Sequence, residues 1–251
     1  MRFIGGLILI FAGIIFALPA PEGFPILEYH TVTKNPDPSS EIYNVPPAEF
    51  SAQLDYLREN GYTTITLNDF IRAKRFGNPL PAKPVILTCD DGYADNYTEM
   101  LPILEAHGMT AVVFVITNEL GKPGYLDLWQ VKDMQRRGIE IGSHTADHLP
   151  LVTLSDDLLI NQIRGSKIFL EWSGLEPIAS LSYPNGVYNS QIIQLLRDEN
   201  YLAAVTGEAG LNNLDSDPYT LRRVNIRKPR FGILEFRWRL LKAEIFAKLK
   251  G

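Results

Sequence analysis

Short apolar runs recur along this chain and alternate with longer amphipathic stretches. The clearest run covers residues 84–89, and others cover 110–116, 140–143 and 178–183. Runs of this length that are rich in β-branched residues predict buried strands, whereas the stretches between them predict helices. Strands that alternate with helices are parallel, and the helices cover the sheet or barrel that they form. We therefore predict one α/β domain, for which 251 residues are sufficient.

Two adjacent carboxylates follow the clearest run, because residues 84–89 lead directly into Asp90, Asp91 and Gly92. Asp-Asp-Gly is favourable turn chemistry, so a plain turn is one interpretation. Two neighbouring carboxylates are, however, costly to remove from water unless a cation, a proton or hydrogen bonds compensate them. The pair therefore indicates either a turn or a site that binds a cation.

Two of the four histidines, His144 and His148, follow the run over 140–143. Two imidazoles and one carboxylate make a three-ligand set for Zn²⁺ or a similar divalent ion, and such a set leaves one coordination position open. One of the paired aspartates could be the third ligand, and the other could act as a base toward water that the ion activates. The alternative is a histidine pair that caps a helix or packs in the core.

Three segments carry a resemblance to a known family: residues 88–92 (TCDDG), 144–148 (HTADH) and 182–186 (SYPNG). Their order and intervals resemble those of the NodB-type polysaccharide deacetylases, carbohydrate esterase family four. The resemblance implies a distorted (β/α)7-type barrel, the NodB homology domain, over residues 24–230. It also implies hydrolytic removal of N-acetyl or O-acetyl groups from a cell-surface polysaccharide, such as poly-N-acetylglucosamine, peptidoglycan or a chitin-like glycan.

The resemblance also assigns roles to the acidic residues and histidines of these segments. It implies that Asp91, His144 and His148 hold the divalent ion, with Zn²⁺ as the first expectation and Co²⁺ or a similar ion as the alternative. It implies that Asp90 is the base. A backbone N–H near Asn185 is expected to stabilise the oxyanion that forms on the acetyl carbonyl.

The general acid departs from the family pattern. Most members supply it from a histidine in a late L-x-H motif, but this chain has no histidine after His148. His30 ends a predicted strand over residues 25–30 and is the remaining histidine at a strand end. We therefore expect His30 to protonate the leaving amine.

The third segment also lacks the arginine that usually orients the base, and Ser182 stands near its place. The predicted last strand, residues 221–226, contains Arg222 and Arg223. Either arginine could take over this role, and either could instead be a surface charge.

The amino-terminal segment, residues 1–20, contains one arginine followed by an apolar run over residues 3–18. This composition is typical of a secretory signal or an uncleaved membrane anchor. The run is slightly shorter than the roughly 20 residues of a comfortable membrane span. We therefore expect an extracytoplasmic protein that is secreted or anchored at the cell envelope, with a buried amino-terminal helix as the alternative.

The carboxyl-terminal segment, residues 231–251, has the pattern of a basic amphipathic helix. It could pack on the barrel, or it could lie at the surface of an anionic membrane. A nucleic-acid partner is not expected, because the net charge of the chain is −5. The single cysteine, Cys89, allows no internal disulfide.

Two other classes of function stay open at this point. A metal-dependent hydrolase of small cyclic amides shares the fold, but an export signal is unexpected for such an enzyme. A carbohydrate-binding protein with a degenerate site would explain the missing late histidine, but the intact Asp-Asp pair and the two histidines argue against it. Release of acetate from acetylated glucosamine oligomers would separate these alternatives.

Overall fold

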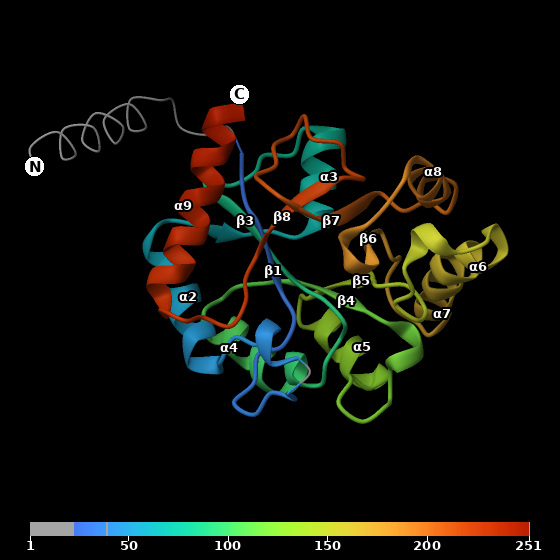
Figure 1. Ribbon diagram of the computed structural model, residues 1–251, viewed down its shortest axis with the longest axis horizontal. Helices are drawn as coiled ribbons and strands as arrows, with labels where there is room; N and C mark the ends of the chain where they lie inside the picture. Colours follow the sequence, from blue (N-terminus) through green and yellow to red (C-terminus); the bar gives the residue numbers. More distant parts are fainter. Residues whose placement is uncertain (1–22, 39, 251) are drawn as a thin grey trace, which may run out of the picture.

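The strands form a parallel barrel (Figure 1), in a computed structural model that describes residues 23–38 and 40–250. The ring closes because β1 (Ile26–Tyr29) pairs with both β3 (Pro84–Cys89) and β8 (Leu221–Asn225). Between β3 and β8 the ring is completed by β4 (Val112–Val115), β5 (Glu140–Ser143), β6 (Ser180–Ser182) and β7 (Ala203–Ala209). The two-residue strand β2 (Thr63–Thr64) lies outside the ring next to β3. The predicted signal or anchor over residues 1–20 lies outside the described residues.

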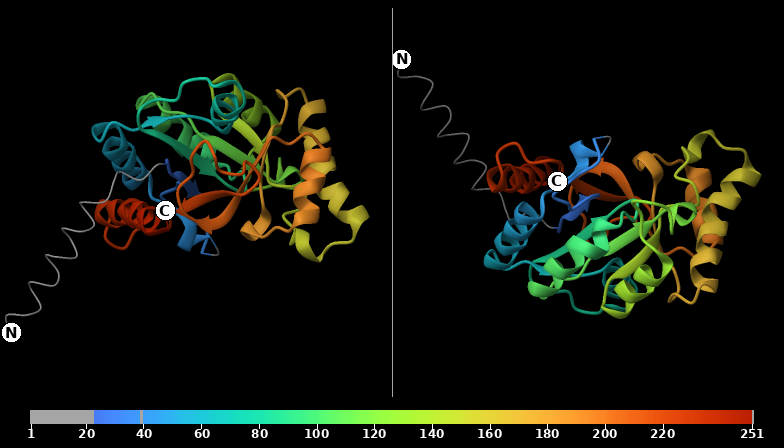
Figure 2. Two further views of the ribbon diagram at one scale, coloured as in Figure 1. Left: turned by 90° about the horizontal axis from the view of Figure 1, so that it is seen from above. Right: turned by 90° about the horizontal axis from the view of Figure 1, so that it is seen from below.

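Helices surround the barrel, as the two further views show (Figure 2). They are α2 (Pro47–Glu59), α3 (Leu67–Phe76), α4 (Leu101–Ala106), α5 (Leu128–Arg136), α6 (Asp156–Ile160), α7 (Ser166–Trp172), α8 (Ser190–Asp198) and α9 (Ile233–Lys250). Several of them begin where the sequence offers a cap. Thr66 and Asp69 form a capping box at the start of α3, and Asp127 forms one at the start of α5. The α/β barrel predicted from the sequence is confirmed.

One predicted helix differs in its detail. The apolar spacing over residues 155–172 predicts a single helix with five side chains on its inner face: Leu158, Leu159, Ile163, Ile168 and Phe169. The structure instead has a π turn over Asn161–Gly165 between α6 and α7. Leu159 and Ile163 are buried as predicted, whereas Leu158, Ile168 and Phe169 are 50%, 37% and 43% exposed. The extra residue of the π turn rotates the face of the helix that follows it, which carries Ile168 and Phe169.

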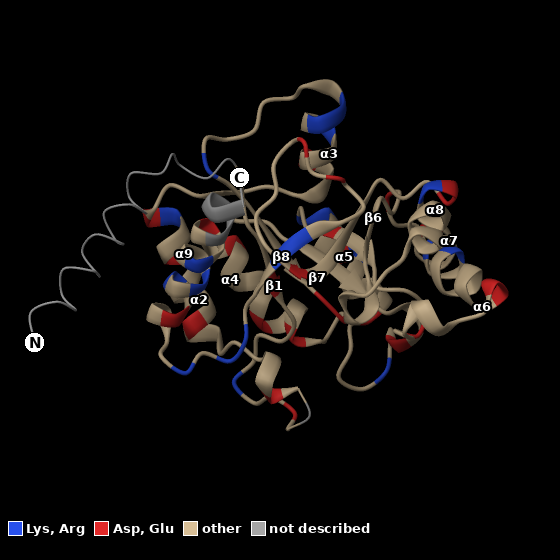
Figure 3. Ribbon diagram, turned by 45° about the horizontal axis from the view of Figure 1, so that its top comes forward, with Lys and Arg blue, Asp and Glu red and all other residues tan. Residues whose placement is uncertain are grey.

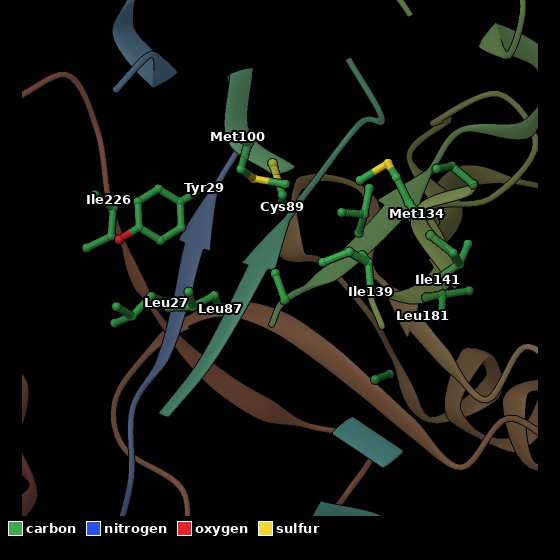
Figure 4. Packing of buried hydrophobic residues seen from close by; sticks show 14 of the residues in the cluster. Leu27, Tyr29, Leu87, Cys89, Met100, Met134, Ile139, Ile141, Leu181 and Ile226 are labelled. Carbon is green, nitrogen blue, oxygen red and sulfur yellow. The ribbon is translucent and has the colours of Figure 1, made fainter. Parts of the chain in front are cut away.

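Alternation along the strands divides the core into two layers. Leu27 and Tyr29 of β1 point outward and pack with Leu87 and Cys89 of β3 under the helices (Figure 4). The residues between them therefore point into the barrel. Cys89 is buried and packs as a small apolar side chain in this outer layer.

The inside of the barrel changes character along its axis. Its amino end is filled by apolar side chains, among them Ile26, Ile86 and Phe114, with Phe70 of α3 packed against them. Its carboxyl end holds buried polar side chains, listed from the first strand to the last: Glu28, Thr88, Asp90, His144, Ser182 and Arg223. The apolar half stabilises the barrel, so the polar half is the part of the interior that is available for chemistry.

The last helix, α9, packs on the outside of the barrel beside α2. The ring of Phe236 lies 5.9 Å from that of Tyr56, and the carboxylate of Glu244 accepts a hydrogen bond of 3.2 Å from the hydroxyl of Tyr62. Among the described residues, no helix is both long enough and apolar enough to span a membrane. The domain boundary predicted at residue 230 stays a prediction.

Candidate active site

The three predicted metal ligands meet at the carboxyl end of the barrel. Asp91 follows β3, and His144 and His148 follow β5. Oδ1 of Asp91 lies 3.5 Å from Nε2 of His144 and 3.9 Å from Nε2 of His148. The two imidazole rings are 4.6 Å apart. The structure therefore brings together two motifs that are about fifty residues apart in the sequence.

The histidines are held in the form that binds metal. Nδ1 of His144 lies 2.8 Å from the carbonyl oxygen of Ser182, so it donates a hydrogen bond and leaves the Nε2 lone pair toward Asp91. Burial lowers the pKa of His148, and the neighbouring His144 lowers it further, although the charge of Asp91 opposes them. The ring of His148 is thus favoured as a neutral imidazole, which is the protonation state that ligates an ion.

The loops at this end of the barrel have unusual backbone angles. Positive φ angles occur at Asp91 (72°), Thr145 (67°), His148 (55°) and Asn185 (58°), and among the described non-glycine residues only Asn200 shares this feature. Each such residue costs about 1–3 kcal/mol, and such residues cluster at functional sites. The strain is largest in principle for Thr145, since β-branched residues avoid this region.

A buried ion pair lies beside the three ligands. Asp90 is 2% exposed, and its Oδ1 accepts a hydrogen bond of 2.9 Å from Nη1 of Arg223, while its Oδ2 accepts one of 2.9 Å from Oγ of Ser182. Burial by itself raises the pKa of Asp90, but the guanidinium of Arg223 and the nearby His144 bring that pKa well below its usual range. Asp90 is therefore ionised, as a base must be.

Arg223, not Arg222, takes the place of the missing arginine. Arg223 is 3% exposed, and its Nε also donates to the carbonyl oxygen of Thr206 at 2.9 Å. Arg222 is exposed and faces Glu208 at 3.6 Å. Both arginines lie in the blue stretch of β8 (Figure 3), but they point to opposite sides of the strand.

Glu28 is a charged residue of this cavity that the sequence analysis missed. It points into the barrel from β1, where Nη2 of Arg223 lies 3.2 Å from its Oε1 and Nδ2 of Asn225 donates to its Oε2 at 2.9 Å. A charged residue flanked by Leu27 and Tyr29 in a buried strand is the signal that could have found it, because such a charge requires a partner.

His30 lies next to this charged group. Its Nε2 is 4.0 Å from Oε1 of Glu28, and its ring lies 4.8 Å from that of Tyr43. Its Nδ1 is buried, and none of the described residues hydrogen-bonds to it. Asn96 and Cys89 both donate to the backbone carbonyl oxygen of His30, which fixes this part of the chain.

All six predicted site residues line one cavity of about 490 Å³. Asn185 lies at its exposed rim, whereas Asp90 and His144 lie at its buried end. The cavity is lined by Glu28, His30, Ser40, Tyr43, Asp90, Asp91, Tyr93, His144, His148, Tyr183, Asn185, Gly186, Gly207, Arg223, Asn225 and Arg227. Its volume is within the range of cavities that take small ligands.

Comparison with known proteins decides the family. The sequence model of the polysaccharide deacetylases matches residues 77–204. YxkH, a Bacillus subtilis protein named for the same family, is 34% identical over 206 residues, which cover 82% of this chain and 72% of YxkH. This chain belongs to the polysaccharide deacetylase family.

Two further family members are similar over most of their length. The poly-β-1,6-N-acetyl-D-glucosamine N-deacetylase of Staphylococcus epidermidis is 26% identical over 238 residues, 84% of this chain and 82% of that enzyme. The Streptococcus pyogenes deacetylase PplD, solved in complex with acetate, superposes with a TM-score of 0.79 at 28% identity and covers 89% of this chain and 99% of PplD. The fold predicted from the resemblance is thus confirmed.

The residues of this polysaccharide deacetylase fit a divalent ion at one position. The candidate ligand atoms of Asp91, His144 and His148 lie within 4.8 Å of one another, and ligands of one tetrahedral zinc ion are about 3.3 Å apart. Glu28, His30 and Asp90 also bring ligand atoms within 4.8 Å of one another. Arg223 already forms ion pairs with both of those carboxylates, however, so the first group is the better ion site.

Proposed function

We propose that this protein is a metal-dependent N-deacetylase of an extracellular polysaccharide, with poly-N-acetylglucosamine as the first candidate substrate. The observation that carries this proposal is the convergence of Asp91, His144 and His148 beside the buried, ionised Asp90 in an open cavity. The similarity to an N-deacetylase of poly-β-1,6-N-acetyl-D-glucosamine supports the choice of polymer.

The ion would be held by Asp91, His144 and His148. Two imidazoles and one carboxylate suit Zn²⁺, and Co²⁺ is the alternative. When bound, such an ion polarises a carbonyl group and lowers the pKa of water. The hydrogen bond from His144 to the carbonyl oxygen of Ser182 would keep the imidazole in the required orientation.

Asp90 is the base in this proposal. Its carboxylate lies 3.9 Å from Nε2 of His144, so it faces the same part of the cavity as the ion ligands. Each carboxylate oxygen has a second lone pair after it has accepted a hydrogen bond from Arg223 or Ser182. One of them takes a proton from the attacking water, whose oxygen bonds to the acetyl carbon.

The same cavity supplies groups for the second half of the reaction. The backbone N–H groups of Gly186 and Val187 donate within their own loop, so we assign the oxyanion donor to the N–H of Asn185 at the rim. His30 gives a proton to the amine as the C–N bond breaks, which releases acetate and a free amine. Oε1 of Glu28 lies 4.0 Å from Nε2 of His30, so its carboxylate faces the ring that gives this proton.

Acetate release from β-1,6-linked N-acetylglucosamine oligomers tests the proposal. We expect release to stop after treatment with a chelator and to return with added Zn²⁺ or Co²⁺. The variant His148→Ala should bind the ion more weakly and need a higher concentration of it for activity. Release that continues in metal-free protein would contradict the proposal, and tight glycan binding without release under any ion would support the carbohydrate-binding alternative.

The same assay on peptidoglycan and chitin fragments, and on O-acetylated glycans, compares the candidate substrates. The proposed polymer should give the highest kcat/KM. A higher value on peptidoglycan fragments would keep the reaction and change the substrate.

We further propose that the protein acts outside the cytoplasm, with residues 1–20 as its signal or anchor. The single arginine followed by an apolar run supports this assignment. Fractionation of cells that produce the full chain, with an amino-terminal sequence of the product, tests both points. A full-length product in the cytoplasmic fraction would contradict the proposal.

A further inference from the structure

The last helix has two apolar faces, and only one of them packs on the barrel. Phe236 and Leu240 are buried against it. On the outer face, Leu234, Trp238 and Leu241 recur at helical spacing and are 64%, 57% and 44% exposed. A helix that serves only to cover a barrel needs one apolar face. The outer face of α9 therefore requires another explanation.

The charges of α9 are distributed unevenly around this outer face. Arg237 and Lys242 are exposed beside it, and the guanidinium of Arg237 lies 5.6 Å from the centre of the Tyr56 ring. The two acidic residues are used elsewhere. Glu235 is paired with Arg239 at 2.6 Å, and Glu244 accepts a hydrogen bond from a tyrosine hydroxyl of the barrel. The exposed side of α9 is thus apolar and cationic.

We propose that the outer face of α9, formed by Leu234, Arg237, Trp238, Leu241 and Lys242, lies on the headgroup region of an anionic membrane. An apolar stripe with tryptophan and flanking basic residues is the composition of helices that lie in this region. The basic residues are attracted to anionic lipids, while the apolar side chains enter the boundary with the acyl chains. This proposal does not depend on the deacetylase reaction.

The position of the start of the described chain favours a membrane over a second protein. Trp238 of α9 and Gly210, which follows β7, line one cavity of about 590 Å³. Asn212, two residues after Gly210, forms a β-bridge with Phe24. The start of the described chain therefore lies on the same side of the molecule as Trp238. The apolar run over residues 3–18 ends six residues before Phe24, or at most about 22 Å of chain. If that run enters a membrane, α9 is near the lipid surface.

A stable protein partner would need more surface than α9 offers. Interfaces between stable partners bury about 800 Å² on each side, whereas the outer apolar side chains of α9 form a stripe one helix wide. A membrane has no such threshold, because partition increases with each apolar side chain and each basic charge.

Tryptophan quenching by lipids tests the proposal in the full chain. The variant Trp129→Phe/Trp172→Phe retains only Trp238, and its matched control Trp129→Phe/Trp238→Phe retains only Trp172. Trp172 is 87% exposed on α7, which lies on the side of the barrel opposite α9 (Figure 1). Both proteins are mixed with vesicles of phosphatidylglycerol and phosphatidylcholine whose acyl chains carry bromine near the glycerol.

We expect the emission of Trp238 to be quenched severalfold more than that of Trp172. Because each protein retains residues 1–22, attachment by the amino-terminal segment alone would leave the two tryptophans equally quenched, and this result would overturn the proposal. A concentration-dependent change in Trp238 emission without vesicles, with no further change on adding them, would show a second copy on this face and also overturn it.

The basic residues are tested separately at limiting lipid. In the protein that retains only Trp238, Arg237→Gln and Lys242→Gln should each reduce partition about fivefold. Vesicles of phosphatidylcholine alone should quench Trp238 weakly. Equal quenching by neutral and anionic vesicles would overturn the assignment of an anionic surface.

Discussion

Asp90 and Glu140 are both carboxylates that point into the barrel, Asp90 buried at its carboxyl end and Glu140 partly exposed at its amino end. Burial raises the pKa of both. For Glu140 it does so to about 7, because the backbone N–H of Asn68 and the hydroxyl of Ser180 oppose it only in part. For Asp90 the guanidinium of Arg223 reverses the effect and leaves the pKa well below its usual range.

The two environments share a serine donor and differ in their charged neighbours, of which Arg223 has the largest effect. Ser180 and Ser182 lie two residues apart on β6, so both point into the barrel. Their hydroxyls donate to Glu140 and Asp90 respectively, each at 2.9 Å. Each carboxylate therefore accepts a hydrogen bond from a serine hydroxyl, whereas the guanidinium of Arg223 is present only beside Asp90. A buried cation keeps a buried carboxylate ionised where a base is needed.

The largest expected effect follows from removing that cation. Arg223→Met leaves the carboxylates of Asp90 and Glu28 buried without a counter-ion, so we expect the free energy of unfolding to fall by about 3–5 kcal/mol. Deacetylation should be lost as well, since the pKa of Asp90 would move toward that of Glu140. Urea denaturation at neutral pH measures the first effect. The matched control Arg222→Met, on the exposed side of β8, should change stability by less than about 0.5 kcal/mol, and equal effects would contradict the comparison.

The next effect concerns activity without stability. Asp90→Asn should reduce acetate release by about 10²- to 10⁴-fold because the base is lost, while Asp91, His144 and His148 still bind the ion. Activity and metal content are measured on the same sample. The control at the other end, Glu140→Gln, should leave turnover unchanged. Loss of the ion together with activity in Asp90→Asn would contradict the division of roles between the two aspartates.

Glu140 itself should make stability depend on pH. Its pKa in the fold, about 7, is above the ordinary value of 4.5, so the folded state favours the protonated form. This contribution is complete below pH 4.5 and is lost as the pH rises through 7. Between pH 5 and pH 8 the protein should lose about 2–3 kcal/mol of stability relative to Glu140→Gln. Urea denaturation at both pH values checks this, and a constant difference between the two proteins would refute it.

The smallest effects are expected when Ser182 and Ser180 are replaced by alanine, and the two variants should differ in which property changes. Ser182→Ala removes one hydrogen bond from Asp90, and we expect acetate release to fall about tenfold, equivalent to about 1.4 kcal/mol. Ser180→Ala removes the corresponding bond from Glu140, so stability at pH 8 should fall by about 1 kcal/mol with turnover unchanged. An equal loss of turnover in both variants would show that the two ends of the barrel are not independent.

Much of this arrangement could be predicted because it is local in the sequence. The strands that carry the site are short apolar runs, and each is followed directly by its polar residues. Parallel strands in a barrel place these residues at one end, so the aspartate pair could be grouped with His144 and His148 before any coordinates were known. The family resemblance then selected Asp91 as the ligand. His30 and Asn185 were placed in the same cavity by the same reasoning.

The partners of Asp90 could not be predicted with the same certainty, since they depend on which face of a strand points inward. In β8, Arg223 and Val224 are both buried, so the strand lacks a regular alternation. The register with β7 also shifts between Val205 and Ala209. Because of these irregularities, a search for alternating residues in β8 does not identify Arg223 as the one that points inward. Glu28 was missed because Arg223 and Asn225, which bind its carboxylate, come from the far end of the chain.

The closure of the ring has a consequence for biosynthesis. β1 is seated between β3 and β8, and β8 is the last strand to leave the ribosome. A nascent chain that ends before residue 221 therefore has neither the seam that completes the ring nor the counter-ion of Asp90. Premature termination in this region should give inactive fragments, and the protein should remain without activity until its synthesis is complete.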